Sequence, residues 1–265
     1  MADEKHSWLA GERVYIATTA AEGCILGARL ATTAGTEDLK EAYGEFQQEA
    51  LALKPDYAPR SVNTDGWEAT QKAWRSLFPG ITIVLCFLHA VLSIQRCCRT
   101  LPKVFSQVTR QLWELYQAKT KAQFAEHLEQ LSRWASEQLL PESIQDKLSQ
   151  FASKAEQFQV AFDVPNAHRT SNMIDRLMNY QDRLLYAMQY FHGSQEAANQ
   201  HLRAMAILWN FHPYCRRVQK MDPYTRSPFE DLNGYQYHDN WLRNFLIASS
   251  LNGHKPQKSQ KHTKS

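Results

Sequence analysis

Three aspartates stand where carboxylates from separate elements of the chain could share metal ions. Asp3 falls in the first expected strand, Asp65 just after the fourth, and Asp175 in the first turn of an expected helix. Strand ends and helix starts are where ligands collect on open sheets. Two divalent ions about 4 Å apart can serve the attacking and leaving oxygens of a phosphodiester, and Mg²⁺ or Mn²⁺ prefers carboxylate oxygens. The three acids therefore predict a Mg²⁺ (or Mn²⁺) centre for phosphodiester chemistry.

Each of these aspartates also has an ordinary structural interpretation. Asp65 precedes Gly66, a pair typical of a turn at a strand exit. The dipole of a helix favours an acid such as Asp175 near its start. Asp3 competes with Glu4 for the ligand role and lies close to the beginning of the sequence, where acids are usually solvated. The joint occurrence of the three acids in this order is what favours the metal centre.

The elements that must position the acids follow from hydrophobic spacing and turn residues. The patterns predict strands at 2–9, 14–19, 24–30, 61–64 and 81–85, and helices at 36–53 and 67–77. The dense β-branched run at 81–85 is typical of a strand buried on both faces. This order predicts an α/β protein with a mixed sheet flanked by helices, the arrangement of RNase H-like proteins.

The rest of the sequence is predicted to be mostly helical. Residues 89–160 are rich in helix-forming types, and Trp113 and Trp134 are expected to pack between helices, with a contact to a DNA base as the alternative. Ser171 or Asn172 is expected to cap a helix that runs through Met188 and is ended by Gly193. A helix at 195–209, a loop rich in Pro and Tyr up to 237 and a helix at 241–251 are expected to follow.

Several sequence blocks resemble bacterial insertion-sequence transposases of the DDE type. The blocks with this resemblance are Asp3-Glu4-Lys5-His6, Thr64 to Thr70, Cys86-Phe87-Leu88-His89, Thr170 to Arg176, Asn210 to Pro213 and Trp241 to Asn244. In that superfamily a catalytic aspartate at a strand end is followed by a Cys-x-x-His element, a helical insertion and an Asn-x-x-acid motif. The resemblance implies metal-dependent DNA cleavage and strand transfer, with Asp3, Asp65 and Asp175 as the catalytic, metal-binding acids.

The same resemblance implies a division of the chain. Residues 1–94 would form the first part of an RNase H-like catalytic core, and 95–165 an α-helical insertion. Residues 166–252 would complete the core and add a helical C-terminal part. The segment 253–265 has four lysines and no acid, so we expect a disordered basic tail, with non-specific phosphate contact as the alternative.

Four further residues are expected to support the site or to contact DNA. The resemblance places His89 near the acids as a phosphate contact or supporting group, and Asn172 at the start of the third acid's helix. Arg176 and Arg183 share one helical face that could follow the DNA backbone, unless that face is simply solvated and ion-paired. Cys86 and His89 also have zinc-ligand spacing, but no second ligand pair is evident, so a buried structural Cys86 is preferred.

Two departures from the family pattern leave an alternative function open. Position 175 carries Asp where Glu is frequent in the superfamily, and the first acid stands at position 3, so no DNA-binding domain precedes the core in this sequence. The alternative is a truncated, inactive remnant that retains DNA or partner binding. A purely helical structural protein would leave the β-rich first third unexplained.

Composition sets the remaining expectations. With 265 residues and 43% apolar content, the chain can form one large domain or a domain with an insertion. A net charge of +3 is compatible with DNA as the partner, at the element ends and the target, on which we expect a homodimer. Five cysteines without a regular framework indicate a reducing compartment. Because no apolar run suits export or membrane insertion, we expect a cytoplasmic, nucleoid-associated bacterial protein with no membrane partner.

Overall fold

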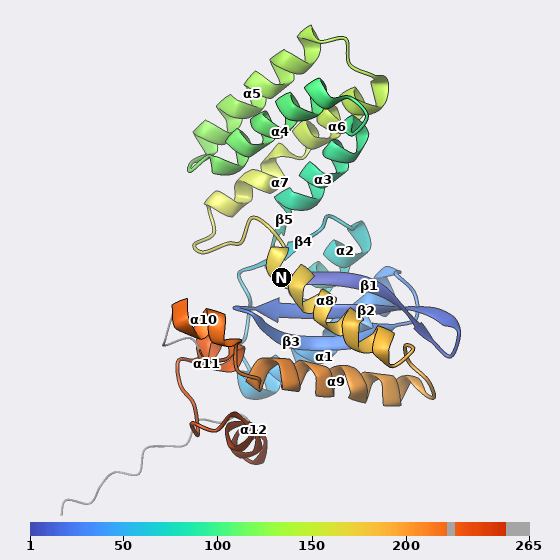
Figure 1. Ribbon diagram of the computed structural model, residues 1–265, viewed down its shortest axis with the longest axis vertical. Coiled ribbons are helices and arrows are strands. Elements are labelled where there is room, and N and C mark those ends of the chain that lie inside the picture. The colour runs from blue at the N-terminus through green and yellow to red at the C-terminus, as the bar shows by residue number, and fades with distance from the viewer. Residues whose placement is uncertain (222–225, 253–265) are drawn as a thin grey trace, which may run out of the picture.

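A computed structural model describes residues 1–221 and 226–252 and shows an α/β protein. In Figure 1, the helical block α3–α7 stands at one end of the strand-containing core, and α10–α12 lie toward the other end. Within the described part of the chain, no helix is both long and apolar enough to cross a membrane. The predicted tail at 253–265 lies outside the described residues.

The strands form an antiparallel sheet and a parallel pair. The antiparallel sheet has the order β1 (Ala2–Leu9), β2 (Glu12–Ala21) and β3 (Cys24–Ala31), joined by tight turns in which Gly11 and Gly23 adopt positive φ. The parallel pair is β4 (Ser61–Thr64) and β5 (Thr82–Leu85). Contacts between β1 and β4 bring the two groups of strands side by side. The five predicted strands are therefore present at the expected places.

Helices cover both faces of the antiparallel sheet. On one face, α1 (Thr36–Leu53) and α2 (Glu68–Leu77) bury residues such as Ala17. On the other face, α8 (Asn172–Ala187) and α9 (Gln195–Phe211) pack against residues such as Ile16. Successive strand residues point to opposite faces, so burial on both sides explains why β2 and β3 have few exposed positions. The predicted α/β class with a helix-flanked sheet is confirmed at this level.

The predicted helical insertion contains no strand in this structure. Its elements are α3 (Phe87–Cys98), α4 (Pro102–Gln117), α5 (Lys121–Glu137), α6 (Glu142–Ser153), α7 (Ala155–Gln159) and the 3₁₀ turn η1 (Val160–Phe162). Helix α3 runs through the expected boundary between 94 and 95. Phe124 and Leu131 pack inside the block, whereas Trp113, predicted to pack between helices, is 57% exposed.

The C-terminal part departs from the prediction in one segment. The expected loop before 237 holds two short helices, α10 (Arg216–Met221) and α11 (Pro228–Asn233). Each spans six residues, too few for a helical repeat to show in the sequence. Ser227 caps the start of α11 and Gly234 ends it in the left-handed conformation. The last described helix, α12 (Trp241–Ser250), follows the prediction.

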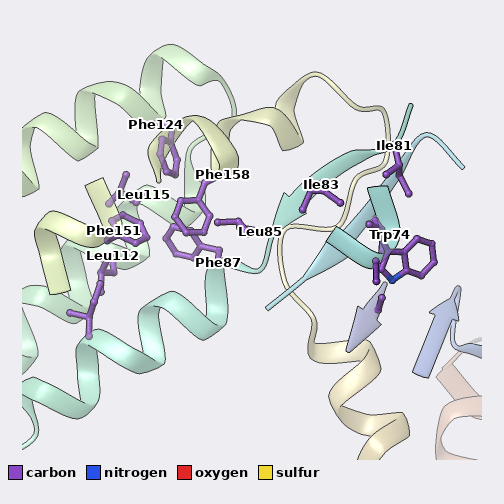
Figure 2. Packing of buried hydrophobic residues seen from close by; sticks show 14 of the residues in the cluster. Trp74, Ile81, Ile83, Leu85, Phe87, Leu112, Leu115, Phe124, Phe151 and Phe158 are labelled. Carbon is purple, nitrogen blue, oxygen red and sulfur yellow. The ribbon is translucent and has the colours of Figure 1, made fainter. Parts of the chain in front are cut away.

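Phe87 joins the helical block to the strands. It follows β5 by two residues and begins α3, and its ring contacts the rings of Phe124, Phe151 and Phe158 at centroid distances of 5.6 to 6.4 Å. Figure 2 shows Phe87 beside Phe151 and Phe158, with Leu85 of β5 next to them. One continuous apolar core therefore extends from the strands into the insertion.

We predict that Phe87→Ala destabilises the protein by about 3–5 kcal/mol, because it opens a cavity where the insertion joins the core. Urea unfolding monitored by circular dichroism measures the change. Phe105→Ala, at a side chain of α4 that is 36% exposed, is the matched control and should change the stability by less than about 0.5 kcal/mol. Similar losses for both variants would show that Phe87 does not hold the junction.

Candidate metal centre

Two strand ends bring the first acids together. Asp3 lies on β1 opposite Thr18 of β2 and is only 8% exposed. Asp65 follows the last residue of β4, the strand beside β1. Carboxylate oxygens of Asp3, Glu4 and Asp65 all lie within 4.8 Å of one another. Two of the three predicted acids therefore meet, and they are joined by Glu4, which was considered only as a competitor of Asp3.

The third predicted acid, Asp175, follows the insertion in sequence and also lies beside Asp3. Asp175 lies in the first turn of α8, as expected. Ligand atoms of Asp3, His89 and Asp175 also lie within 4.8 Å of one another. Asp3 thus belongs to both groups of candidate ligands. All three predicted acids, together with His89, converge around this one buried carboxylate.

Hydrogen bonds tie the start of α8 to the ends of β4 and β5. The amide N–H of Phe87 donates to the carbonyl oxygen of Arg169 at 2.9 Å, and Asn63 Nδ2 donates to the carbonyl oxygen of His168 at 2.9 Å. The amide N–H of Ser171 points to Cys86 Sγ at 3.2 Å. These contacts fix where the chain returns from the insertion, and so they position Asp175.

Ser171 has a different role from the predicted helix cap. It stands at the cap position of α8, but its side chain makes no capping hydrogen bond. Its hydroxyl instead lies 3.2 Å from Cys86 Sγ and 3.3 Å from His89 Nδ1. Cys86 is 1% exposed and belongs to neither ligand group within residues 1–221 and 226–252. The cysteine therefore lies beside both Ser171 and His89 and helps to fix the orientation of the imidazole.

Glu4 is held in place by two hydroxyl groups. Tyr43 of α1 donates to Glu4 Oε1 at 2.5 Å, and Thr70 of α2 donates to the same oxygen at 2.7 Å. The other carboxylate oxygen makes no such bond among the described residues. No site role was predicted for Glu4, although an adjacent pair of acids inside a β-strand is a signal that could have suggested one.

Asp65 combines the turn and the site interpretations. Its Oδ1 accepts the amide N–H of Trp67 at 2.8 Å, and Gly66 between them has a φ of 98° that favours glycine. The turn therefore holds the Asp65 side chain at the strand exit. A carboxylate has two oxygens with several lone pairs, so this hydrogen bond leaves capacity for a cation.

Burial and mutual repulsion raise the pKa values of Asp3 and Glu4. Burial, followed by repulsion from Asp65 and Glu4, raises the pKa of Asp3 to about 7. Burial also raises the pKa of Glu4, although the hydroxyls of Thr70 and Tyr43 act in the opposite direction. A bound cation would favour the charged form of every one of these carboxylates.

The pKa of the His89 imidazole is also raised, which favours the charged form of this side chain. A hydrogen bond with Cys86 raises the pKa of His89 to about 9 against the effect of burial, and the carboxylates of Asp3 and Asp175 add to the rise. A cation bound there would displace this proton, because a metal-ligating imidazole is neutral.

The predicted DNA-contacting residues lie around the site without joining it. Asn172, Arg176 and Arg183 are all exposed on α8. The ion pair expected on this helix is made by Asp182 with Lys5 of β1, a residue to which the sequence analysis gave no role. The guanidinium of Arg169 donates to the carbonyl oxygens of Leu115, Tyr116 and Ala118 at the end of α4.

The donor set fits a hard divalent cation. Four carboxylates supply oxygen ligands, as Mg²⁺ and Mn²⁺ require, and the single imidazole nitrogen is a donor that Mn²⁺ accepts more readily than Mg²⁺. No protein-family model matches the chain, and a search of curated proteins finds no match either. The site is therefore interpreted from the chemistry of its own residues.

We predict that Asp3→Asn makes the stability of the metal-free protein less dependent on pH. The folded chain keeps the Asp3 proton up to about pH 7, whereas the unfolded chain releases it near its usual pKa of 3.8. The resulting stabilisation is complete below about pH 4 and is lost as the pH rises to about 7. Urea unfolding in EDTA at stepped pH should show a steeper fall for the wild type than for Asp3→Asn.

Asp146→Asn provides the matched control, since it removes an exposed acid of α6 that belongs to neither ligand group. This variant should keep the wild-type slope of stability against pH. Parallel curves for the wild type and Asp3→Asn would mean that the Asp3 carboxyl group is not strained by burial among like charges.

Proposed function

We propose that this chain is the RNase H-like catalytic core of a DDE-type DNA transposase. The observation that carries the proposal is the convergence of Asp3, Asp65 and Asp175 from three separate elements around one buried position. Structural acids are usually dispersed or paired with bases, whereas these carboxylates gather with like charges. The cluster contains His89 as a basic group and has carboxylate oxygens that can hold cations, and phosphodiester chemistry on two cations is a reaction that suits it.

The order of the strands supports the same proposal. Strand β2 lies between β1 and β3, the other edge of β1 contacts β4, and β5 pairs with β4 in parallel. An antiparallel sheet β1-β2-β3 with a parallel pair β4-β5 beside β1 is compatible with the mixed sheet of RNase H-like proteins. The helical block between β5 and α8 then takes the place of the insertion found in the transposases that the sequence resembles.

The residues divide into two positions that share Asp3. Asp65 and Glu4 lie with Asp3 in one group, and Asp175 and His89 lie with it in the other. When bound, the two cations supply an activated oxygen nucleophile and stabilise the leaving oxygen. Asp3 would be a ligand in both positions. The bonds of Glu4 to Tyr43 and Thr70 orient one side of the site, and the contact of Ser171 with His89 orients the other.

The reaction proceeds in two displacements at phosphorus. In the first, the oxygen of water bonds to the phosphorus at an element end while the bond to the 3′ oxygen breaks, which leaves a 3′-OH and a 5′-phosphate. In the second, that 3′ oxygen bonds to a phosphorus of target DNA and displaces its 3′ oxygen. Because an element has two ends, we propose that two copies of the chain act together on DNA.

We predict that the protein binds Mn²⁺ through both ligand groups. Asp3→Asn should weaken Mn²⁺ binding by at least about 10-fold. Loss of a residue that only supports a ligand already costs about 10-fold in metal affinity, and loss of a ligand should cost no less. His89→Ala should remove the ¹⁴N coupling from the electron spin echo spectrum of bound Mn²⁺, while Asp65→Asn should retain it. Titration calorimetry and the echo spectrum measure the two effects. A wild-type spectrum without ¹⁴N coupling would exclude His89 as a ligand.

We predict that Asp65→Asn abolishes metal-dependent strand cleavage and leaves DNA binding nearly intact, because it removes a ligand charge with little change of shape. The substrate is a linear duplex that carries the genomic segments on both sides of the coding sequence. Gel shift measures binding, and denaturing gels measure cleavage in Mg²⁺ and Mn²⁺. Asp146→Asn is the matched control and should cleave like the wild type.

Three outcomes of this experiment separate the candidate functions. Equal cleavage by the wild type and Asp65→Asn would mean that the activity comes from elsewhere. Binding that weakens with salt, with no cleavage by the wild type, would favour the inactive remnant. Neither binding nor cleavage would favour a structural protein.

A further inference from the structure

A second polar surface adjoins the metal centre at a cavity of about 190 Å³. Asp65 and His89 line it from the core, and Lys147, Gln150 and Lys154 line it from the insertion. The cavity therefore lies where helix α6 approaches the ends of β4 and β5. One of its walls belongs to the candidate metal centre, and the other carries two cationic side chains.

Helical spacing explains why these three insertion residues share one wall. Positions 147, 150 and 154 are three and seven residues apart, so they lie on one face of α6 and its C-terminal cap. Leu148 and Phe151 lie on the face that packs into the insertion core. The two lysines therefore have no part in holding that core together.

Neither lysine is committed to an ion pair in the described part of the chain. Lys147 makes only a side-chain contact with Gln150, at 3.3 Å. In the same block Lys121 pairs with Asp163, and Arg133 pairs with Glu129. Lys154 also stands at the helix C-terminus, whose partial negative charge it offsets. The wall thus presents two lysines that form no ion pair within residues 1–221 and 226–252, and Asp65 lines the cavity with them.

This charge is what a nucleic-acid backbone would need beside a cluster of acids. The carboxylates around Asp3 repel phosphate, and cations at the metal centre would neutralise only the groups next to the reacting phosphodiester. The cavity is smaller than the roughly 300–1,000 Å³ typical of small-molecule sites, so it suits a backbone phosphate better than a free drug-sized ligand.

We propose that Lys147 and Lys154 bind backbone phosphates of the DNA strand that enters the metal centre. This inference rests on the proposed function, and it gives the insertion a direct part in substrate binding. Gln150 lies between the lysines on the same face and adds an amide donor. The strand would pass between α6 and the strand ends, with its reacting phosphodiester at the acids.

The test measures the binding of a fluorescent oligodeoxythymidine at several salt concentrations in Ca²⁺, by fluorescence anisotropy. Each phosphate contact contributes about 0.7 to the slope of log affinity against log salt for a single strand. The double variant Lys147→Ala/Lys154→Ala should therefore lower the magnitude of the slope by about 1.4. The double variant Lys147→Arg/Lys154→Arg should keep it, since it preserves both charges.

Lys103→Ala is the matched control, because Lys103 is an exposed lysine of the same insertion that does not line the cavity. It should retain the wild-type slope, and thermal unfolding should show that all variants fold. A double alanine variant with the slope of the wild type would overturn the proposal, and so would an equal loss in Lys103→Ala.

Cleavage of the genomic duplex, measured beside oligodeoxythymidine binding, distinguishes a failure of this inference from a failure of the proposed function. If the double alanine variant binds like the wild type while Asp65→Asn stops cleavage, the phosphate site is wrong and the catalytic assignment stands. If the slope falls by about 1.4 but the wild type never cleaves, the phosphate site is supported and the catalytic assignment is wrong.

Discussion

Repulsion among carboxylates at the ends of β1 and β4 is the constraint on which the arrangement of this chain depends. Buried charges cost free energy unless hydrogen bonds or opposite charges compensate them. Glu4 is compensated by two hydroxyl groups, whereas Asp3 accepts the backbone amide of Glu4 at 2.9 Å and lies near the imidazole of His89. The pKa of Asp3 is raised because burial of its charge is only partly compensated. A fold optimised for stability alone would not keep an aspartate there, and the cluster has the carboxylate oxygens to hold a cation.

The rest of the fold keeps these repelling groups from separating. Asp175 is far from Asp3 in sequence, and a continuous aromatic core around Phe87 makes the intervening helices a rigid connection. Arg169 fastens the returning chain to the end of α4 and stacks against the ring of Phe162 at 4.7 Å. The insertion therefore serves two purposes, since it returns the third acid to the site and places a cationic face of α6 beside it.

Local patterns in the sequence were sufficient for the elements and for the three aspartates. Turn residues, β-branched runs and helical spacing located the five strands and the longer helices outside the insertion, whereas residues 89–160 were predicted only as a helical block. The roles of Glu4, Ser171 and Arg169 were not predicted, since each depends on partners brought close only by the tertiary fold. The exposure of Trp113 was missed for the same reason: a helical pattern shows that a residue lies on an apolar stripe, but not that a neighbouring helix covers it.

Position 175 carries an aspartate, which is shorter than the glutamate frequent in the superfamily that the sequence resembles. The contacts of its own helix explain how the shorter side chain lies beside Asp3. An aspartate reaches roughly 1.5 Å less far than a glutamate, so a site that uses it must hold the helix closer to the metals. Here the amide and hydroxyl of Ser171 lie 3.2 Å from the buried sulfur of Cys86, which draws the first turn of α8 against the end of β5. A side chain larger than cysteine at this point would push the helix outward. Cys86 and Asp175 are therefore coupled by geometry, and the Cys-x-x-His element supports the site as a small buried spacer as well as through its histidine.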